Sequence, residues 1–386
     1  MDADSTAVLV RDVRQTFFSL LGIPSPSLQE GALARYCVAR LRELGMTVEV
    51  DRAGEEIGAD TGNLIAWLPG DTTLPTILLC AHMDTVPSAV EVRPRVDEGG
   101  IVHTDKTAVL GADDKAGVAA ILAALRQIRR LRPTHGPIQV LLTIAEERGM
   151  EGIRRLQPQR LAADFGLCLD SDGPVGTFVV TGMGCVSFRI EYGFRASPAD
   201  VRQTSAVRTL RQVLVELRRS PAFADVQWEI AQFMGVERDH GLGVQAVGRI
   251  RSWSNRQLQA AVRAMRTAFQ SLAMRTDSYF ILETDVSFPA YDIPAHSMVR
   301  ERIEQSMRRC GLTPVPMRVT DGSDANWLCG EFGLPVVNLG MGYEHAHSVR
   351  ERIAISDICD VTRVVLDFVA NPPRNPLEGG AWHGQP

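Results

Sequence analysis

The chain reads Thr76-Ile77-Leu78-Leu79-Cys80-Ala81-His82-Met83-Asp84-Thr85-Val86-Pro87 where a long apolar run ends in polar residues. The apolar part predicts a buried parallel strand, and Pro87 prevents a central strand from continuing. Polar residues at the carboxyl end of such a strand lie where α/β sheets bind their ligands. Residues two apart in an extended segment point to the same side, so His82 and Asp84 can act as a pair. Either His82 binds a metal ion while Asp84 orients a neighbouring group, or His82 only caps backbone groups.

Four further apolar stretches also end in acidic residues or histidines. In chain order, these ends carry Asp113-Asp114, Glu146-Glu147, Asp170 with Asp172, and His345 with His347. Asp113 and Asp114 precede an Ala-rich helix pattern, where an ordinary helix cap would also use an acid. Two adjacent glutamates directly after a buried strand repel each other where water is scarce, and a bound cation accounts for both. The regular placement of these residues at five strand ends favours a shared cation site.

The order of these motifs resembles the M20 family of co-catalytic metallopeptidases, and within it the peptidase T-like branch of tripeptide aminopeptidases. The motifs are His-x-Asp at 82–84, Gly-Ala-Asp-Asp-Lys-Ala-Gly at 111–117, Glu-Glu at 146–147, Asp170, and His-Ser-x-x-Glu at 347–351. Similar segments begin near Phe17, continue through 321–326, and end near Ile355. The resemblance therefore covers most of the chain.

The resemblance implies a two-metal site whose ligands are His82, Asp113, Glu147, Asp170 and His347. Asp113 would bridge both ions, Glu146 would be the general base, and Asp84 would hold the ring of His82 without touching metal. Oxygen and imidazole donors without thiolates suit zinc, with manganese or cobalt as alternatives. Two such ions about 3.5–4 Å apart can lower the pKa of a bridging water and polarise a carbonyl group. Glu146 would then take a proton from that water and pass it to the leaving amine.

Two neighbouring histidines compete for the last ligand position. His345 and His347 are two residues apart and would share one face of a strand. The His-Ser-x-x-Glu pattern selects His347 as the ligand and leaves His345 as a neighbour or a solvated residue. Asp114 and Asp172 are expected to act as caps or supporting acids.

Composition fits a large enzyme and shows no basic bias. The chain has 386 residues, a net charge of −5 and a pI near 6.0, which disfavours nucleic-acid binding. The sequence has no apolar stretch of the roughly 20 residues that cross a membrane, and its acidic start has no apolar core of the kind expected for a signal peptide. Seven scattered cysteines are expected to be free buried thiols. We therefore expect a cytoplasmic protein.

A change in the order of predicted strands and helices along the chain predicts an inserted domain. Up to about Thr181 strands and helices alternate, which predicts an α/β fold with a mostly parallel sheet and helices on both faces. The following segments read as βαββαβ, the order of a ferredoxin-like module. The predicted parts are a catalytic domain at 1–182 and 292–386 and an inserted domain at 183–291. The resemblance implies that this insertion is a lid and a surface for homodimer formation.

The inserted domain is also where the sequence departs from the family pattern. Relatives carry a lid histidine after the first lid strand, but residues 194–200 contain none. His240 could replace it as a donor to the reacting carbonyl, or it could be a solvated loop histidine. Arg251 matches the family's lid arginine and could clamp a substrate carboxylate, or it could be a surface arginine on a strand.

The predicted function is hydrolysis of the amide bond of short peptides by a tripeptidase-like aminopeptidase. One alternative is a related amidohydrolase that removes an acyl group from N-acyl amino acids with the same metals and Glu146. The other is a catalytically silent relative that only binds a partner. The complete ligand set together with a base argues against the silent relative, since binding alone has no need for a base beside a metal ligand.

Overall fold

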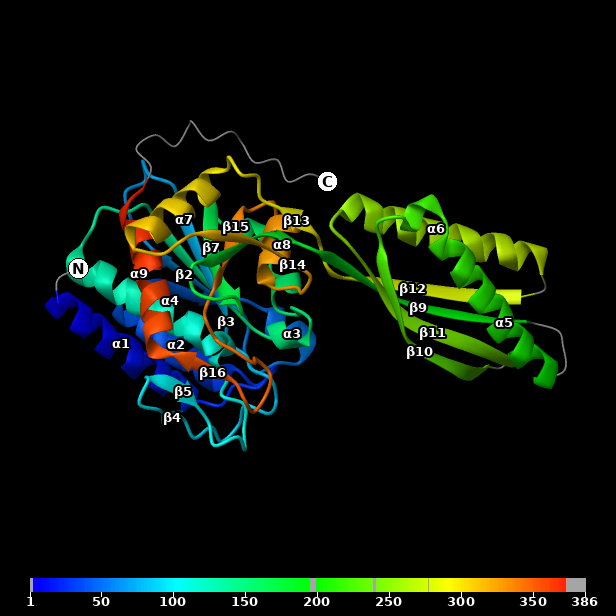
Figure 1. The fold of residues 1–386 in the computed structure, drawn as a ribbon, viewed down its shortest axis with the longest axis horizontal. Helices are drawn as coiled ribbons and strands as arrows, with labels where there is room; N and C mark the ends of the chain where they lie inside the picture. Colours follow the sequence, from blue (N-terminus) through cyan, green and yellow to red (C-terminus); the bar gives the residue numbers. More distant parts are fainter. Residues whose placement is uncertain (1–2, 195–198, 239–240, 277, 373–386) are drawn as a thin grey trace. The chain divides into compact units, whose positions relative to one another are not determined.

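The computed structural model describes residues 3–194, 199–238, 241–276 and 278–372 (Figure 1). The chain forms two compact units. The first contains, among the described residues, 3–180, 292–318 and 323–372. The second contains Thr181–Tyr291 and Val319–Gly322.

The first unit is built on a large mixed sheet whose strands follow the order β1-β2-β6-β3-β7-β15-β8-β13, with β14 beside β8. The central strands β6, β3, β7 and β15 run parallel to one another, and the flanking pairs β1–β2, β2–β6 and β15–β8 are antiparallel. The bounds are β1 Thr47–Val50, β2 Leu64–Leu68, β3 Ile77–His82, β6 Ile138–Thr143, β7 Phe165–Ser171, β8 Thr177–Gly182, β13 Tyr291–Asp292, β14 Val315–Val319 and β15 Val336–Gly340. A small sheet in the order β16-β5-β4 joins β16 Arg352–Ala354, β5 Ile101–His103 and β4 Arg95–Val96.

Helices cover this sheet, with α4 and α9 on one side of the strands and α8 on the other (Figure 1). Helix α4 lies against β3 and β7 and also packs on α1 and α9, while α8 contacts β15. The helices of this unit are α1 Ala3–Leu21, α2 Gly31–Glu43, α3 Ala53–Ile57, α4 Ala112–Leu131, α7 Met298–Arg309, α8 Asp324–Gly330 and α9 Ile355–Ala370. Short 3-10 turns form η1 Glu146–Arg148, η2 Ile153–Arg155 and η3 Pro158–Arg160. The predicted α/β class is confirmed, and the parallel pairing lies at the centre of the sheet.

The central strands are apolar because helices cover them. Every residue of β3, β6 and β15 is buried. Buried parallel strands show such continuous apolar runs, whereas strands with one wet face alternate. Since these strands are parallel neighbours, their carboxyl ends meet at one edge, and this edge carries the polar residues that follow each apolar run.

The second unit has the predicted βαββαβ order. Its antiparallel sheet has the order β10-β11-β9-β12, which is that of a ferredoxin-like fold. The elements are β9 Gly184–Phe194, α5 Ala199–Arg218, η4 Pro221–Phe223, β10 Gln227–Arg238, β11 Gly241–Ser252, α6 Asn255–Arg275 and β12 Ser278–Phe288. An apolar core between this sheet and its helices includes Phe188, Tyr192 and Phe269. Residues 195–198 and the candidate lid donor His240 lie outside the described residues.

The cysteines are unpaired, as the sequence predicted. All seven cysteines are free thiols; Cys310 is half-buried and the other six are buried. Among the described residues, no helix is long and apolar enough to cross a membrane.

Candidate metal centre

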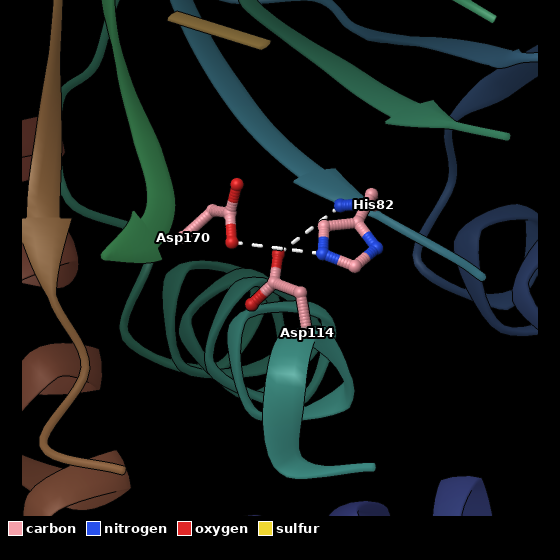
Figure 2. A group of neighbouring side chains, drawn as sticks. All are labelled: His82, Asp114 and Asp170. Atoms are coloured by element: carbon pink, nitrogen blue, oxygen red, sulfur yellow. Dashed lines mark hydrogen bonds and ion pairs between the residues drawn. The ribbon is translucent and has the colours of Figure 1, made fainter. Parts of the chain in front are cut away.

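The five predicted ligands come from four neighbouring strand ends and the start of one helix. His82 is the last residue of β3, Asp170 lies at the end of β7, and Asp113 is in the first turn of α4. Glu147 lies in the turn η1 that follows β6, and His347 follows β15. Figure 2 shows the ends of β3 and β7 and the start of α4 converging around His82 and Asp170. The structure therefore brings together residues that are up to 265 positions apart.

The carboxylate of Asp113 lies between two histidines. Its Oδ1 is 3.0 Å from Nε2 of His82, and its Oδ2 is 3.0 Å from Nε2 of His347. On the His82 side, Asp170 Oδ1 is 3.6 Å from the same Nε2. On the His347 side, Glu147 Oε1 is 2.9 Å from the same Nε2. The four remaining residues thus form two pairs, His82 with Asp170 and His347 with Glu147, and one carboxylate faces both.

The neighbouring Asp114 has a different environment from Asp113. One of its carboxylate oxygens accepts the backbone N–H of His82 at 3.1 Å (Figure 2). The other accepts that of Gly117 at 3.1 Å. Asp114 is fully buried, whereas the side chain of Asp113 retains some exposure. Because backbone donors occupy both of its oxygens, Asp114 acts as the cap and support that the sequence predicted.

Asp84 supports the turn behind the site as well as the ring of His82. Nδ1 of His82 lies 2.9 Å from the carbonyl oxygen of Asp84 and 3.4 Å from its Oδ1. The carboxylate of Asp84 also accepts the backbone N–H groups of Glu146 and Glu147 at 2.9 and 3.1 Å. Asp84 is fully buried. Its contact with the His82 ring therefore runs through the backbone carbonyl first, and its carboxylate orients the two glutamates.

The residues present fit divalent cations. His82 forms two clusters in which one donor atom of each residue lies within 4.8 Å of the others, one with Asp113 and Glu147 and one with Asp114 and Asp170. The donors are oxygen and imidazole nitrogen, which suit zinc, manganese or cobalt. Several carboxylates share this small, poorly solvated volume, and such crowding is costly without compensating positive charge.

The electrostatic effects within the site follow from burial and from the His–carboxylate contacts. Burial raises the pKa of Asp170 to about 6. Hydrogen bonds with Asp113 and Glu147 raise the pKa of His347 to about 10. Burial, with the charge of Asp170 adding to it, raises the pKa of Glu146 well above its ordinary value. A carboxyl group with a raised pKa is better suited to exchange protons near neutral pH than an exposed glutamate is.

The sequence did not indicate several residues that support the site. Glu351 accepts the backbone N–H groups of Gly111 and Asp113 at 2.7 and 3.0 Å, and Asn63 accepts that of Ile144 at 3.1 Å. Glu30 accepts the N–H of Ala145 at 3.0 Å. Their signal in sequence is weak, because a single acid or amide near a helix or strand end has many ordinary uses. Glu351 alone belonged to a recognised pattern, His-Ser-x-x-Glu.

The remaining candidate residues make none of the contacts described for this cluster. His345 and Asp172 are exposed. Arg251 lies on β11 in the second unit and is half-buried, and its Nε has no hydrogen-bond partner among the described residues. His240 lies outside the described residues, so the structure does not place it.

Comparisons with known proteins agree with the fold and the motifs. Residues 78–371 match the family described as Peptidase family M20/M25/M40. The chain is 29% identical over 360 residues to the uncharacterized protein YqjE of Bacillus subtilis, covering 92% of this chain and 96% of that protein. It is 24% identical over 399 residues to Peptidase T of Geobacillus thermodenitrificans, covering 89% and 92% of the two chains.

Two crystal structures resemble this structure over nearly its whole length. They are aminopeptidase PepT from Bacillus cereus and a tripeptidase from Staphylococcus aureus. In each case the TM-score is 0.83, the identity is 27%, and the match covers 94% of this chain and 98% of the other. The resemblance to the peptidase T-like branch that the sequence motifs indicated is confirmed.

Proposed function

Since the chain belongs to peptidase family M20/M25/M40, we propose that it is a tripeptidase-like aminopeptidase that cleaves short peptides at a two-metal site. That it is a metallopeptidase follows from the family and from its Peptidase T relatives. The proposal adds the number of metal ions, the class of substrate and the role of each residue. The single observation that carries it is the carboxylate of Asp113, which faces His82 with one oxygen and His347 with the other.

In this proposal His82, Asp113 and Asp170 hold one cation, and His347, Asp113 and Glu147 hold the other. Zinc fits these donors best, and manganese and cobalt fit them too. Cations bound there would supply Lewis acidity toward the scissile carbonyl and lower the pKa of the attacking water. Asp84 holds the backbone of Glu146 and Glu147, so it keeps the base and a ligand in fixed relation to each other.

Glu146 is the proposed general base. It lies next to the ligand Glu147 in the same turn, and its carboxyl group is largely buried, which raises its pKa. In the proposed reaction its carboxylate accepts a proton from the attacking water and donates that proton to the nitrogen of the leaving amine. Glu146 therefore returns to its starting carboxylate form at the end of the reaction.

Arg251 is the proposed contact for a substrate carboxylate. Its half-buried guanidinium has an Nε without a hydrogen-bond partner among the described residues, and a planar guanidinium suits a carboxylate group. His240 is retained as a proposed donor to the reacting carbonyl. The predicted homodimer through the second unit and the cytoplasmic location stay predictions.

The test is a substrate panel with metal analysis. Purified protein is loaded with zinc, manganese or cobalt, and its bound metal is counted by mass spectrometry. Each form is assayed with tripeptides, N-terminally blocked tripeptides and N-acyl amino acids. We expect about two metal ions per chain and cleavage of free tripeptides only. Cleavage of N-acyl amino acids instead would establish the deacylase alternative, and metal binding without hydrolysis of either class would favour the silent relative.

A further inference from the structure

The segment at residues 23–30 supplies no ligand to the proposed metal site, yet it contacts several of the turns that do. Ser27 Oγ donates a hydrogen bond to the carboxylate of Asp84 at 2.7 Å, beside the end of β3. The carbonyl oxygen of Ile23 accepts a hydrogen bond from Nζ of Lys115 at 2.8 Å, at the start of α4. Lys115 is fully buried, so this contact is part of the interior. The segment therefore stabilises the turns that carry the proposed ligands through hydrogen bonds.

Glu30 is the member of this segment that reaches the turn after β6. Its Oε1 accepts the backbone N–H of Leu28 at 2.9 Å and that of Ala145 at 3.0 Å. The residue is fully buried, and its Oε2 has no hydrogen-bond partner among the described residues. Burial raises the pKa of Glu30 to about 7, and the nearby charge of Asp84 adds to this effect. Burying a carboxyl group with one oxygen unpaired lowers the stability of the fold, so we expect this residue to have a function that outweighs the cost.

Side chains hold the N–H groups of the turn that Glu30 contacts, while its carbonyl groups at 144–146 accept backbone N–H groups of residues 149–152. The backbone N–H groups of residues 144–147 donate in order to Asn63, to Glu30 and, for the last two, to Asp84. Ala145 has φ of +52°, a left-handed conformation that alanine disfavours. The turn depends on these acceptors because its own sequence does not favour this backbone shape.

We propose that Glu30 is a positioning residue that keeps Glu146 and Glu147 in their working orientation by accepting the N–H of Ala145. This inference rests on the proposed function, in which Glu146 is the base and Glu147 a ligand. Asp84 fixes the N–H groups of those two residues, and Glu30 fixes the residue just before them. Removing the Glu30 acceptor leaves the buried N–H of Ala145 without a partner and weakens the hold on its left-handed backbone, which turns both glutamates.

The experiment compares three substitutions that differ in whether the acceptor survives. Glu30→Gln keeps an oxygen at the place of Oε1, Glu30→Asp withdraws it by one methylene, and Glu30→Ala removes it. Glu55→Ala is the matched control, because Glu55 is exposed in the neighbouring helix α3. For each variant we measure kcat and KM on a tripeptide and the affinity for zinc by competition with a chelator.

We expect Glu30→Ala to lower kcat by about 10–100-fold with little change in KM, and to lower zinc affinity by about tenfold. Glu30→Gln and Glu55→Ala should remain close to the wild type in both measurements. Wild-type kcat and zinc affinity in folded Glu30→Ala would overturn the proposal. So would an equal loss in Glu30→Gln, since charge rather than the acceptor would then matter.

Should Glu30→Ala fail to fold, Glu30→Asp replaces it, with the same expected loss and the same contradicting result. Should the wild-type protein cleave no peptide, the zinc affinities still test the role of Glu30. Failure of the proposed function is thereby distinguished from failure of this inference.

Discussion

The two units of the chain bury different kinds of side chain. The first unit buries many charged groups, whose fully or nearly fully buried members are Glu30, His82, Asp84, Asp114, Lys115, Arg302, Asp324 and Glu351. The second unit has a core of apolar residues, on which its buried Phe269 stacks with the half-buried Phe280 at a ring-centroid distance of 6.0 Å. Among the described charged residues of that unit, only Glu191 is buried. Buried charges cost stability and persist where they are paired or hydrogen-bonded, while apolar burial stabilises. The comparison indicates that chemistry is concentrated in the first unit and that the second unit is stabilised by ordinary packing.

The largest expected effect tests where the chemistry lies. Glu146→Gln removes the proposed proton acceptor but keeps the size of the side chain. We expect kcat to fall by about 10²–10⁴-fold while the bound metal, counted by mass spectrometry, stays the same. Asp172→Asn is the control, because this exposed acid lies near the end of β7 outside the cluster. Loss of metal in Glu146→Gln would instead make Glu146 a ligand.

A substitution in the apolar core of the second unit should reduce stability and leave the metal site intact. Phe269 is fully buried on α6. We expect Phe269→Ala to lower the free energy of unfolding by about 3–5 kcal/mol, measured by urea denaturation, because it leaves a cavity. Metal content under native conditions should not change, since the proposed ligands all belong to the first unit. Met274→Ala on the same helix is the control, because Met274 is 81% exposed and its loss should have little effect.

The same contrast explains which features the sequence could predict. Continuous apolar runs predicted β3, β6, β7 and β15, since burial on both faces leaves a clear pattern. The alternation and helical periodicity of residues 183–291 predicted the βαββαβ order, which is confirmed. The strand-end rule also placed the candidate ligands, and the structure brings them together. It could not find Glu30 or Asn63, because their contacts join segments 115 and 81 positions apart and no local pattern records them.

Metal removal should destabilise the crowded carboxylates of the first unit. A cation that binds only the folded state at about 1,000 times its Kd stabilises that state by about 4 kcal/mol. We therefore expect a chelator to lower the melting temperature and abolish hydrolysis, and zinc to restore both. The control is the same titration on Asp113→Asn, in which the shared carboxylate is lost and the chelator should have a smaller effect. Identical melting of the wild-type protein with and without chelator would contradict the metal assignment.

The buried carboxyl group of Glu30, in the first unit, predicts that the free energy of unfolding depends on pH. Burial raises its pKa from 4.5 to about 7, so the folded state retains a proton that the unfolded state releases between these values. The contribution of Glu30 to the wild-type free energy of unfolding is therefore lost as the pH rises from 4.5 to about 7. The Glu30→Gln variant has no such loss, because glutamine does not titrate. We expect the free energy of unfolding of Glu30→Gln, relative to the wild type, to increase by up to about 3 kcal/mol between pH 5 and pH 8. A difference that stays constant in urea titrations at both pH values would refute this.

The smallest expected effect concerns Arg251. A role for this residue in substrate binding would mean that the second unit also contributes to the chemistry of the protein. If Arg251 binds the carboxylate end of a peptide, Arg251→Ala should raise KM by about tenfold with kcat unchanged, as expected when an interaction common to ground and transition states is removed. Arg249→Ala is the matched control, because Arg249 lies two residues earlier on β11 and pairs with Glu229 at 3.1 Å. The decisive measurement uses a tripeptide with an amidated C-terminus. This substrate lacks the carboxylate, so the effect of Arg251→Ala should disappear if the two groups interact directly. An equal rise of KM for the free and the amidated peptide would show that Arg251 acts through the packing of its strand.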